Sequence, residues 1–283
     1  MALRKATRQT AKLRIGLSAV SGGGKTVSAL KIAYGLTGDW SKIALIDTEN
    51  GSGDLYANDS KLEIGEYNVL TLREHSPNDY IRAIKECEKA DMKVIIIDSC
   101  THEWEWCLAY QIKLGGTYND WGPVKLHHKA FKKAILDSSA HVITTVRRKT
   151  DYLAETIDGK LKITKAGLKE VQEDGFEYEL TTNFEILDKH MARVSKDRTG
   201  LFTGEANFII TEETGVKFKE WSEGSAGDIE ELLRIAILEI QSSVTEENLK
   251  QIFNQFISIQ GNPDFIKALS SKKTELKELT AVK

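Results

Sequence analysis

The chain has 283 residues, with 39 lysines and arginines against 42 aspartates and glutamates, so its formal net charge is -3. This balance excludes a surface that attracts nucleic acid everywhere, and any such contact must come from local patches. No apolar run approaches the ~20 residues that span a bilayer, and no signal-peptide core follows the basic start, so we expect a cytoplasmic protein without a membrane role. Three cysteines without a CxxC pair support neither a disulfide framework nor a zinc cluster.

Short apolar runs alternate with helical patterns through the first half of the chain. Strands are expected at 13–18, 42–47, 93–98 and 141–146, and helices at 25–36, 77–90, 102–113 and 123–138. This alternation predicts βαβ units on a parallel sheet. Segments 176–187 and 191–195 flank the polar Asp188-Lys189-His190 and predict an antiparallel hairpin at the sheet edge.

The composition changes near the C-terminal end. Residues 222–227 are rich in serine and glycine and predict a linker, and helical patterns follow at 228–241, 245–260 and 263–278. We therefore predict an α/β fold with a mostly parallel sheet, an antiparallel hairpin extension and a small C-terminal helical module. The predicted parts are a basic arm at 1–12, a core at 13–221, a linker at 222–227 and the helical module at 228–283.

A phosphate-loop pattern follows the first predicted strand. The segment Ala19-Val20-Ser21-Gly22-Gly23-Gly24-Lys25-Thr26 matches G-x-x-x-x-G-K-[ST], with Ala19 in the place of the first glycine. A strand pattern precedes it and a helix pattern follows, whereas a merely flexible glycine turn would not require this context. We expect backbone N–H groups of Ser21, Gly22, Gly23 and Gly24 to bind phosphate, Lys25 to bind the β- and γ-phosphates, and the Thr26 hydroxyl to bind Mg²⁺. ATP and Mg²⁺ are the predicted cofactors.

Two apolar strands end in acidic residues. Residues 94–97 lead into Asp98, which we predict to complete the Mg²⁺ site. Many P-loop ATPases carry a glutamate directly after this aspartate, but Ser99 stands there and cannot accept a proton from water. Residues 43–46 lead into Asp47-Thr48-Glu49, and Glu49 is the candidate to orient and deprotonate the attacking water. The alternative for Asp47 and Glu49 is an exposed turn.

These strand ends, with the strand at 141–146, resemble the core of RecA-type recombinases. The resemblance implies that Glu49 is catalytic and that Thr145 or Arg147 senses the γ-phosphate. It also implies that Lys196 and Arg198 reach across a subunit interface to a neighbour's ATP, although without it they are a solvated hairpin end. A homo-oligomer, ring or filament, with ATP between subunits is the assembly that the resemblance implies.

Three stretches, 147–152, 172–179 and 196–198, are similar to phage-encoded, minimal RecA-like ATPases of single-strand annealing and recombination. The resemblance covers about 13–220. It implies single-stranded DNA as a partner, with a single-strand-binding or replication protein as a further one. For a phage protein the expected location is the cytoplasm of the bacterial host.

Basic residues provide candidate DNA contacts. The helix at 123–138 has one lysine-rich face, and two more basic residues follow the predicted sensor strand; the candidates are Lys125, Lys129, Lys132, Arg148 and Lys149. His128 and Lys133 share the helix face, and no acid lies among these residues; a merely solvated helix face is the alternative. The aromatic side chains of Trp104, Trp106, Tyr118 and Trp121 are candidates for stacking on bases, but packing in a core or subunit interface is their commoner role.

The leading hypothesis is a RecA-like ATPase, stimulated by single-stranded DNA, that acts in recombination or strand annealing. The alternative is a nucleotide-switched assembly factor, such as a helicase loader, whose C-terminal helices bind a protein partner. A small-molecule kinase is disfavoured because no arginine-rich lid is evident and because Glu49 stands where water activation would need it. The six histidines show no spacing typical of a metal site, and we assign them no catalytic role.

Overall fold

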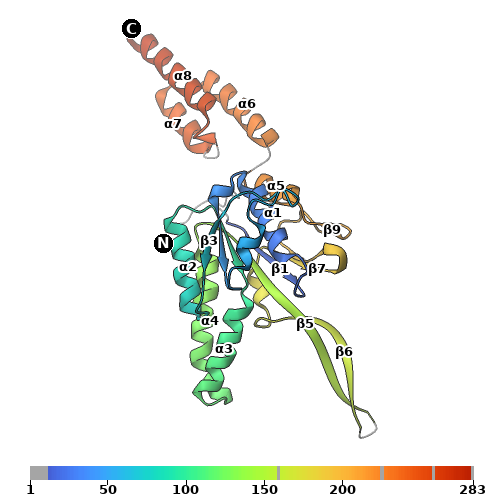
Figure 1. Ribbon diagram of the computed structural model, residues 1–283. Coiled ribbons are helices and arrows are strands. Elements are labelled where there is room, and N and C mark those ends of the chain that lie inside the picture. The colour runs from blue at the N-terminus through green and yellow to red at the C-terminus, as the bar shows by residue number, and fades with distance from the viewer. Residues whose placement is uncertain (1–11, 158–159, 224–225, 257–258, 282–283) are drawn as a thin grey trace. The chain divides into compact units, whose positions relative to one another are not determined.

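The computed structural model describes residues 12–157, 160–223, 226–256 and 259–281 (Figure 1). Two compact units divide these residues: one is Lys12–Lys219, and the other contains Glu220–Lys283. Apart from Lys12, the predicted basic arm lies outside the described residues. Ser222 and Glu223 end one helix, and Ala226 and Gly227 begin the next. The described residues of the predicted linker are therefore helical.

The larger unit is built on a mixed sheet with strand order β3-β2-β4-β5-β1-β7-β8-β9. Its strands are β1 (Arg14–Ala19), β2 (Ile43–Asp47), β3 (Asn68–Thr71), β4 (Val94–Asp98), β5 (His141–Ile157), β7 (Thr182–Ile186), β8 (Met191–Asp197) and β9 (Phe208–Ile209). The strands from β3 to β7 in this order are parallel, and β8 and β9 are antiparallel. The predicted α/β fold with an antiparallel edge hairpin is confirmed.

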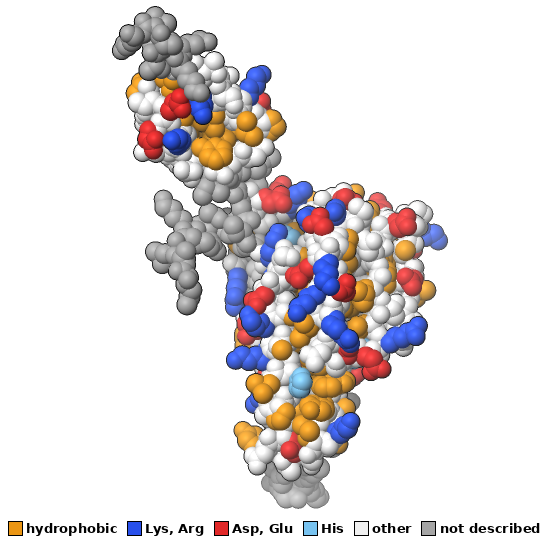
Figure 2. Space-filling model, turned by 90° about the vertical axis from the view of Figure 1, so that its left-hand side faces the viewer, with side chains coloured by type: hydrophobic (Ala, Val, Ile, Leu, Met, Phe, Trp, Pro, Cys, Tyr) orange, Lys and Arg blue, Asp and Glu red, His pale blue; other side chains and the backbone are white. Residues whose placement is uncertain are grey.

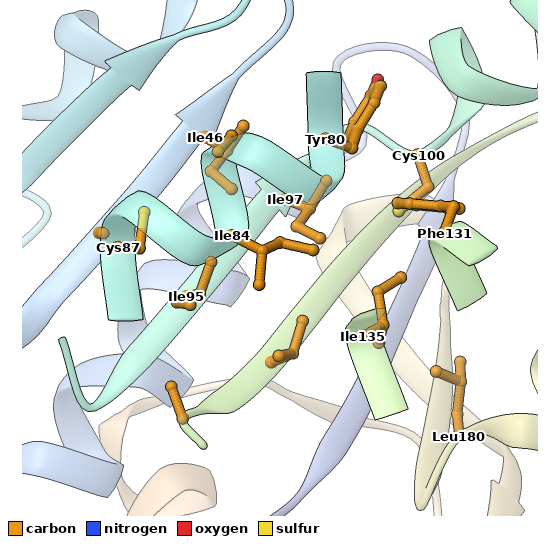
Figure 3. Close-up of a cluster of buried hydrophobic side chains, with 14 of the residues drawn as sticks. Ile46, Tyr80, Ile84, Cys87, Ile95, Ile97, Cys100, Phe131, Ile135 and Leu180 are labelled. Carbon is orange, nitrogen blue, oxygen red and sulfur yellow. The ribbon is translucent and has the colours of Figure 1, made fainter. Parts of the chain in front are cut away.

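Helices cover the central strands, which explains their continuous apolar sequence. The helices are α1 (Lys25–Thr37), α2 (Pro77–Lys89), α3 (Thr101–Leu114), α4 (Trp121–Asp137) and α5 (Glu212–Glu223). Figure 3 shows Tyr80 and Ile84 of α2 and Phe131 of α4 packed with Ile95 and Ile97 of β4. Every residue of β2 and β4 is buried, because a parallel sheet with both faces covered has no solvated side.

Helices α1 and α5 pack at backbone distance. A Cβ atom on Gly35 would lie 2.0 Å from the carbonyl oxygen of Glu212, and one on Gly215 would lie 2.2 Å from that of Ile32. Only glycine allows this approach, because any side chain would force the helices apart. The sequence analysis did not predict α5, whose first turn contains Glu212 and Glu213 rather than an apolar stripe.

Strand β5 continues past the predicted end at residue 146 to Ile157, and β6 (Lys160–Glu170) pairs with it. The two form a long antiparallel ribbon that extends beyond the sheet (Figure 1). Polar and charged residues are frequent from Arg147 to Asp151, so the sequence lacks the apolar run by which the core part of β5 is recognised. Strands β7 and β8 form the predicted hairpin, but Phe176–Glu179 is a short 3-10 helix, η5, rather than strand.

The unit that contains Glu220–Lys283 has its own small core. The described helices are α6 (Ala226–Ser242), α7 (Glu246–Gln255) and α8 (Pro263–Ala281), close to the three predicted helices. Thr245 caps α7, since its side chain accepts a hydrogen bond from the backbone N–H of Asn248. Ile240, Ile252 and Phe265 are among the buried residues that join the three helices.

Candidate nucleotide site and neighbouring groove

The phosphate loop connects β1 to α1 at the carboxyl edge of the sheet. Gly22 and Gly24 have φ angles of 74° and 90°, which favour glycine. The backbone N–H of Gly23 donates to the Val20 carbonyl at 3.1 Å and closes the loop. Helix α1 begins at Lys25, so its first N–H groups point into the loop, where they and the helix dipole favour an anion. The strand–loop–helix arrangement predicted from the sequence is present.

The side chain of Lys25 lies inside this loop rather than in solvent. Its Nζ atom is 3.2 Å from the Val20 carbonyl oxygen and 3.5 Å from that of Ala19. Burial lowers the pKa of Lys25, and the carboxylates of Asp98 and Glu49 act in the opposite direction. A cation held by neutral carbonyl groups in a partly desolvated loop is well placed to exchange them for phosphate oxygens.

Asp98 ends β4 beside the loop and accepts two hydroxyl groups. The Thr26 hydroxyl donates to its Oδ2 atom at 2.6 Å, and the Thr145 hydroxyl donates to its Oδ1 atom at 2.5 Å. Burial raises the pKa of Asp98, and a bound cation would favour its charged form again. Hydroxyl and carboxylate oxygens are the ligands that Mg²⁺ prefers, so Thr26 and Asp98 fit the predicted metal role.

Glu49 and Arg147 come together at the same edge, from β2 and β5. The Arg147 guanidinium donates to Glu49 Oε1 from Nε at 3.1 Å and from its terminal nitrogen at 2.6 Å. Both side chains are about one third exposed, so solvent weakens the pair. The structure thus brings the predicted base and the predicted sensor into contact. Asp47, in contrast, accepts the backbone N–H groups of Glu49 and Gly51 and shapes the turn.

Lys196 and Arg198 lie away from this chain's own phosphate loop. Their side chains donate to backbone carbonyls of η5, with distances of 2.8 Å for Lys196 and 2.6 Å for Arg198. In the sheet Lys196 is level with Asn183 and, one strand further, with Gly16, which is in the amino-terminal half of β1. They therefore do not contact the loop within one chain, and their role at a neighbour's ATP stays a prediction.

The predicted lysine face of α4 is not continuous, which corrects the sequence analysis. Lys132 is bound to Glu173 at 2.5 Å, Lys133 pairs with Asp137, and His128 is buried. Lys125 and Lys129 are exposed. On the face of the molecule shown in Figure 2, basic and acidic side chains are interspersed rather than segregated.

The two basic candidates that follow the sensor position on β5 differ in their surroundings. Arg148 forms an ion pair with Glu185 at 3.3 Å, donates to the Leu168 carbonyl and is only 10% exposed. Lys149 is exposed. These contacts favour a structural role for Arg148 and leave Lys149 accessible to a ligand.

A groove of about 580 Å³ lies where α3 and α4 meet the base of the β5–β6 ribbon. Its lining combines aromatic and basic side chains that the sequence analysis considered separately: Trp104, Tyr118, Trp121, Lys125 and Lys149, together with Lys169. The rings of Trp104 and Trp121 stack with centroids 5.9 Å apart, and Tyr118 is 86% exposed. Four acidic residues also line the groove; among them, Glu173 pairs with Lys132, Asp174 pairs with Lys169, and Glu170 accepts a hydrogen bond from Asn183.

A buried polar cluster lies behind the groove and was missed from the sequence. His128 bonds to Glu103 through Nδ1 at 3.1 Å and to Glu173 through Nε2 at 3.2 Å, while Cys107 donates to Glu103. Burial and the Glu103 charge raise the pKa of the Cys107 thiol. Glu103, Cys107 and His128 are close enough to hold a metal ion, but their atoms already satisfy one another, so we assign none. Glu103 and Cys107 share one face of α3 at i and i+4, but His128 comes from α4 and Glu173 from the segment after β6, and no local spacing links them to that pair.

The fold and the loop, with Lys25, Thr26 and Asp98 gathered at the carboxyl edge of a parallel sheet, define a P-loop nucleoside triphosphatase. Residues 11–199 match the family described as AAA domain. Because the match covers more than half of the chain, the protein belongs to this family of P-loop AAA-type ATPase domains. No curated protein shows significant similarity to the chain. Among the helices of the described residues, none has the length and apolar composition that crossing a bilayer requires.

Proposed function

We propose that the protein is a DNA-stimulated ATPase that acts on single-stranded DNA in phage-type recombination or strand annealing. The groove between α3, α4 and the β5–β6 ribbon carries this proposal. Exposed aromatic rings beside lysines are the combination by which proteins bind single strands, since bases stack on the rings and phosphates meet the cations. Subunits would form a homo-oligomer with ATP between neighbours.

The nucleotide chemistry follows from the site. Bound Mg²⁺ supplies positive charge at the β- and γ-phosphates, and Thr26 and Asp98 would hold it. Lys25 and the loop N–H groups would bind the phosphate oxygens. Glu49 would orient a water molecule and take its proton as the water oxygen bonds to the γ-phosphorus and the bond to the β-phosphate oxygen breaks, giving ADP and phosphate. Both Arg147 hydrogen bonds go to Oε1 of Glu49, so Oε2 would be the atom that takes the proton.

Strand β5 supports a connection between the groove and the nucleotide site. Thr145 bonds to Asp98, Arg147 bonds to Glu49, and Lys149 lines the groove two residues further on. A strand displaced by DNA at Lys149 would carry the two preceding contacts with it. This arrangement supports stimulation of hydrolysis by DNA.

Steady-state ATP hydrolysis, with and without a poly-thymidine strand, tests the proposal. The native chain should turn over ATP faster with DNA, Lys25→Ala and Glu49→Gln should abolish turnover, and Tyr118→Ala should lose the stimulation alone. Ile112→Ala is the matched control, because Ile112 is an exposed α3 residue that does not line the groove. If the hydrolysis rate of the native chain is the same with and without DNA, the DNA role is refuted. If the native chain does not bind ATP, the whole proposal is refuted.

A groove in the smaller unit favours a second candidate function, the nucleotide-switched assembly factor. This groove, of about 420 Å³ between α7 and α8, has an apolar floor that includes Leu249, Phe253 and Leu269, with Lys250 and Lys273 beside it. An apolar groove of this kind suits a segment of a protein partner. Two results together would favour this second function over the first. DNA would leave the hydrolysis rate unchanged, and Phe253→Asp would abolish binding of a replication-protein partner without changing ATP turnover.

A further inference from the structure

The turn between β7 and β8 has an unusual backbone. Lys189 and His190 are consecutive non-glycine residues in the left-handed region, with φ angles of 58° and 59°. This is the geometry of a tight type I′ hairpin turn, which the Met191 N–H closes on the Asp188 carbonyl, although glycine and asparagine are the residues that favour it. His190 is exposed at this turn.

The turn brings the imidazole of His190 onto the phosphate loop. Its Nδ1 atom is 3.2 Å from the carbonyl oxygen of Gly23, so Nδ1 must carry the proton and donate. The ring also lies against Gly24, where a Cβ atom would be 2.8 Å from the same nitrogen. Gly23 and Gly24 are the two residues directly before Lys25, and their peptide groups must point correctly for phosphate to bind.

We propose that His190 is a positioning residue for the nucleotide, which holds the phosphate loop in its binding conformation through Gly23. The proposal rests on the proposed ATPase function and adds a residue to it from outside the loop. A loop held in place before ATP arrives loses less conformational freedom on binding, which strengthens binding without touching the reacting atoms. Loss of the contact therefore acts on affinity and leaves the chemical step in place.

Three substitutions separate the contact from the backbone conformation. His190→Asn keeps a nitrogen donor at the position of Nδ1 and tolerates the left-handed region. His190→Gly relaxes the backbone but removes the donor, and His190→Ala removes the donor while keeping a side chain. Binding of a fluorescent ATP analogue with Mg²⁺, and the KM and kcat of hydrolysis, would be measured for each full-length variant.

We expect His190→Ala and His190→Gly to weaken ATP binding about fivefold, the value of one net hydrogen bond, and to raise KM with kcat nearly unchanged. His190→Asn should restore most of the affinity. Native affinity in His190→Gly would overturn the proposal, because only the backbone would then matter, and a fall in kcat alone would also overturn it. A native chain that binds no ATP would refute the proposed function itself, which separates the two failures.

Discussion

The two ends of the same parallel strands use polar side chains in opposite ways. At the amino end, the guanidinium of Arg14 is buried and donates to four backbone carbonyls, among them those of Ser138 and Ala140 at 2.6 and 2.8 Å. His141 accepts the backbone N–H of Leu13 at 3.1 Å. At the carboxyl end, Asp98 and Glu49 bond to other side chains instead. The four carbonyl partners hold the Arg14 side chain in place, whereas the side-chain partners of Asp98 and Glu49 can rotate away and give their place to a ligand.

If the carboxyl end is the reactive one, Glu49→Gln should strongly reduce hydrolysis. Glutamine keeps the size but cannot take a proton from water, so the hydrolysis rate should fall by roughly 10²–10⁴-fold while ATP binding persists. Turnover and nucleotide affinity would be measured side by side, with the exposed Glu66→Gln as a control. Equal losses in both variants, or loss of ATP binding, would show that Glu49 is not the base.

The Lys196→Ala, Arg198→Ala double variant tests whether the site is completed by a neighbour. A cation that stabilises the transferring phosphoryl group is worth about 10³-fold or more, so this variant should be nearly inactive. Mixing it with Lys25→Ala chains should restore activity, because some interfaces would then combine an intact loop with intact cations. No recovery on mixing, although mixed oligomers form, would argue against action across an interface.

At the amino end a substitution should change stability rather than catalysis. Burial, assisted by the charges of Lys12 and Arg14, lowers the pKa of His141 to about 4. The unfolded chain binds this proton near pH 6.5 and the folded chain only near pH 4, so the stabilisation is complete above pH 6.5 and is lost as pH falls toward 4. Between pH 7.5 and 5 the loss from this group should be about 2 kcal/mol.

His141→Asn removes this titration while its side-chain oxygen can still accept the Leu13 N–H. Urea unfolding at the two pH values should therefore show a smaller loss for the variant than for the native chain. The same pH dependence in both proteins would contradict the assignment to His141. ATP turnover per folded molecule should not change.

The smallest effects are expected for the lysines at the groove. Lys125→Ala and Lys149→Ala should each weaken binding of single-stranded DNA about tenfold or less. Each should also make the negative slope of log affinity against log salt shallower by about 0.7. Lys133→Ala is the control, because Lys133 is already paired with Asp137. An unchanged salt slope for Lys125→Ala and Lys149→Ala would mean that these side chains do not meet phosphates.

The sequence analysis succeeded where burial and function act on neighbouring residues. The apolar runs before Asp47 and Asp98, and the loop before Lys25, are local patterns, and they predicted the parallel core and the gathering of Lys25, Thr26 and Asp98. Contacts between distant residues left no such pattern. Glu173 neutralises Lys132 from 41 positions away, and His190 reaches Gly23 from 167 positions away. Such contacts depend on tertiary packing that no local spacing encodes.

Strand β8 would connect two nucleotide sites in the proposed oligomer. It starts directly after His190, beside this chain's phosphate loop, and ends near Lys196 and Arg198, the cations proposed for the neighbour. Its seven residues span about 20 Å, and hydrogen bonds to β7 hold the strand extended. If ATP binding at the phosphate loop tilted β8 slightly, Lys196 and Arg198 at its other end would move. In the proposed oligomer, ATP binding in one subunit would then act on hydrolysis in its neighbour without a large domain rotation.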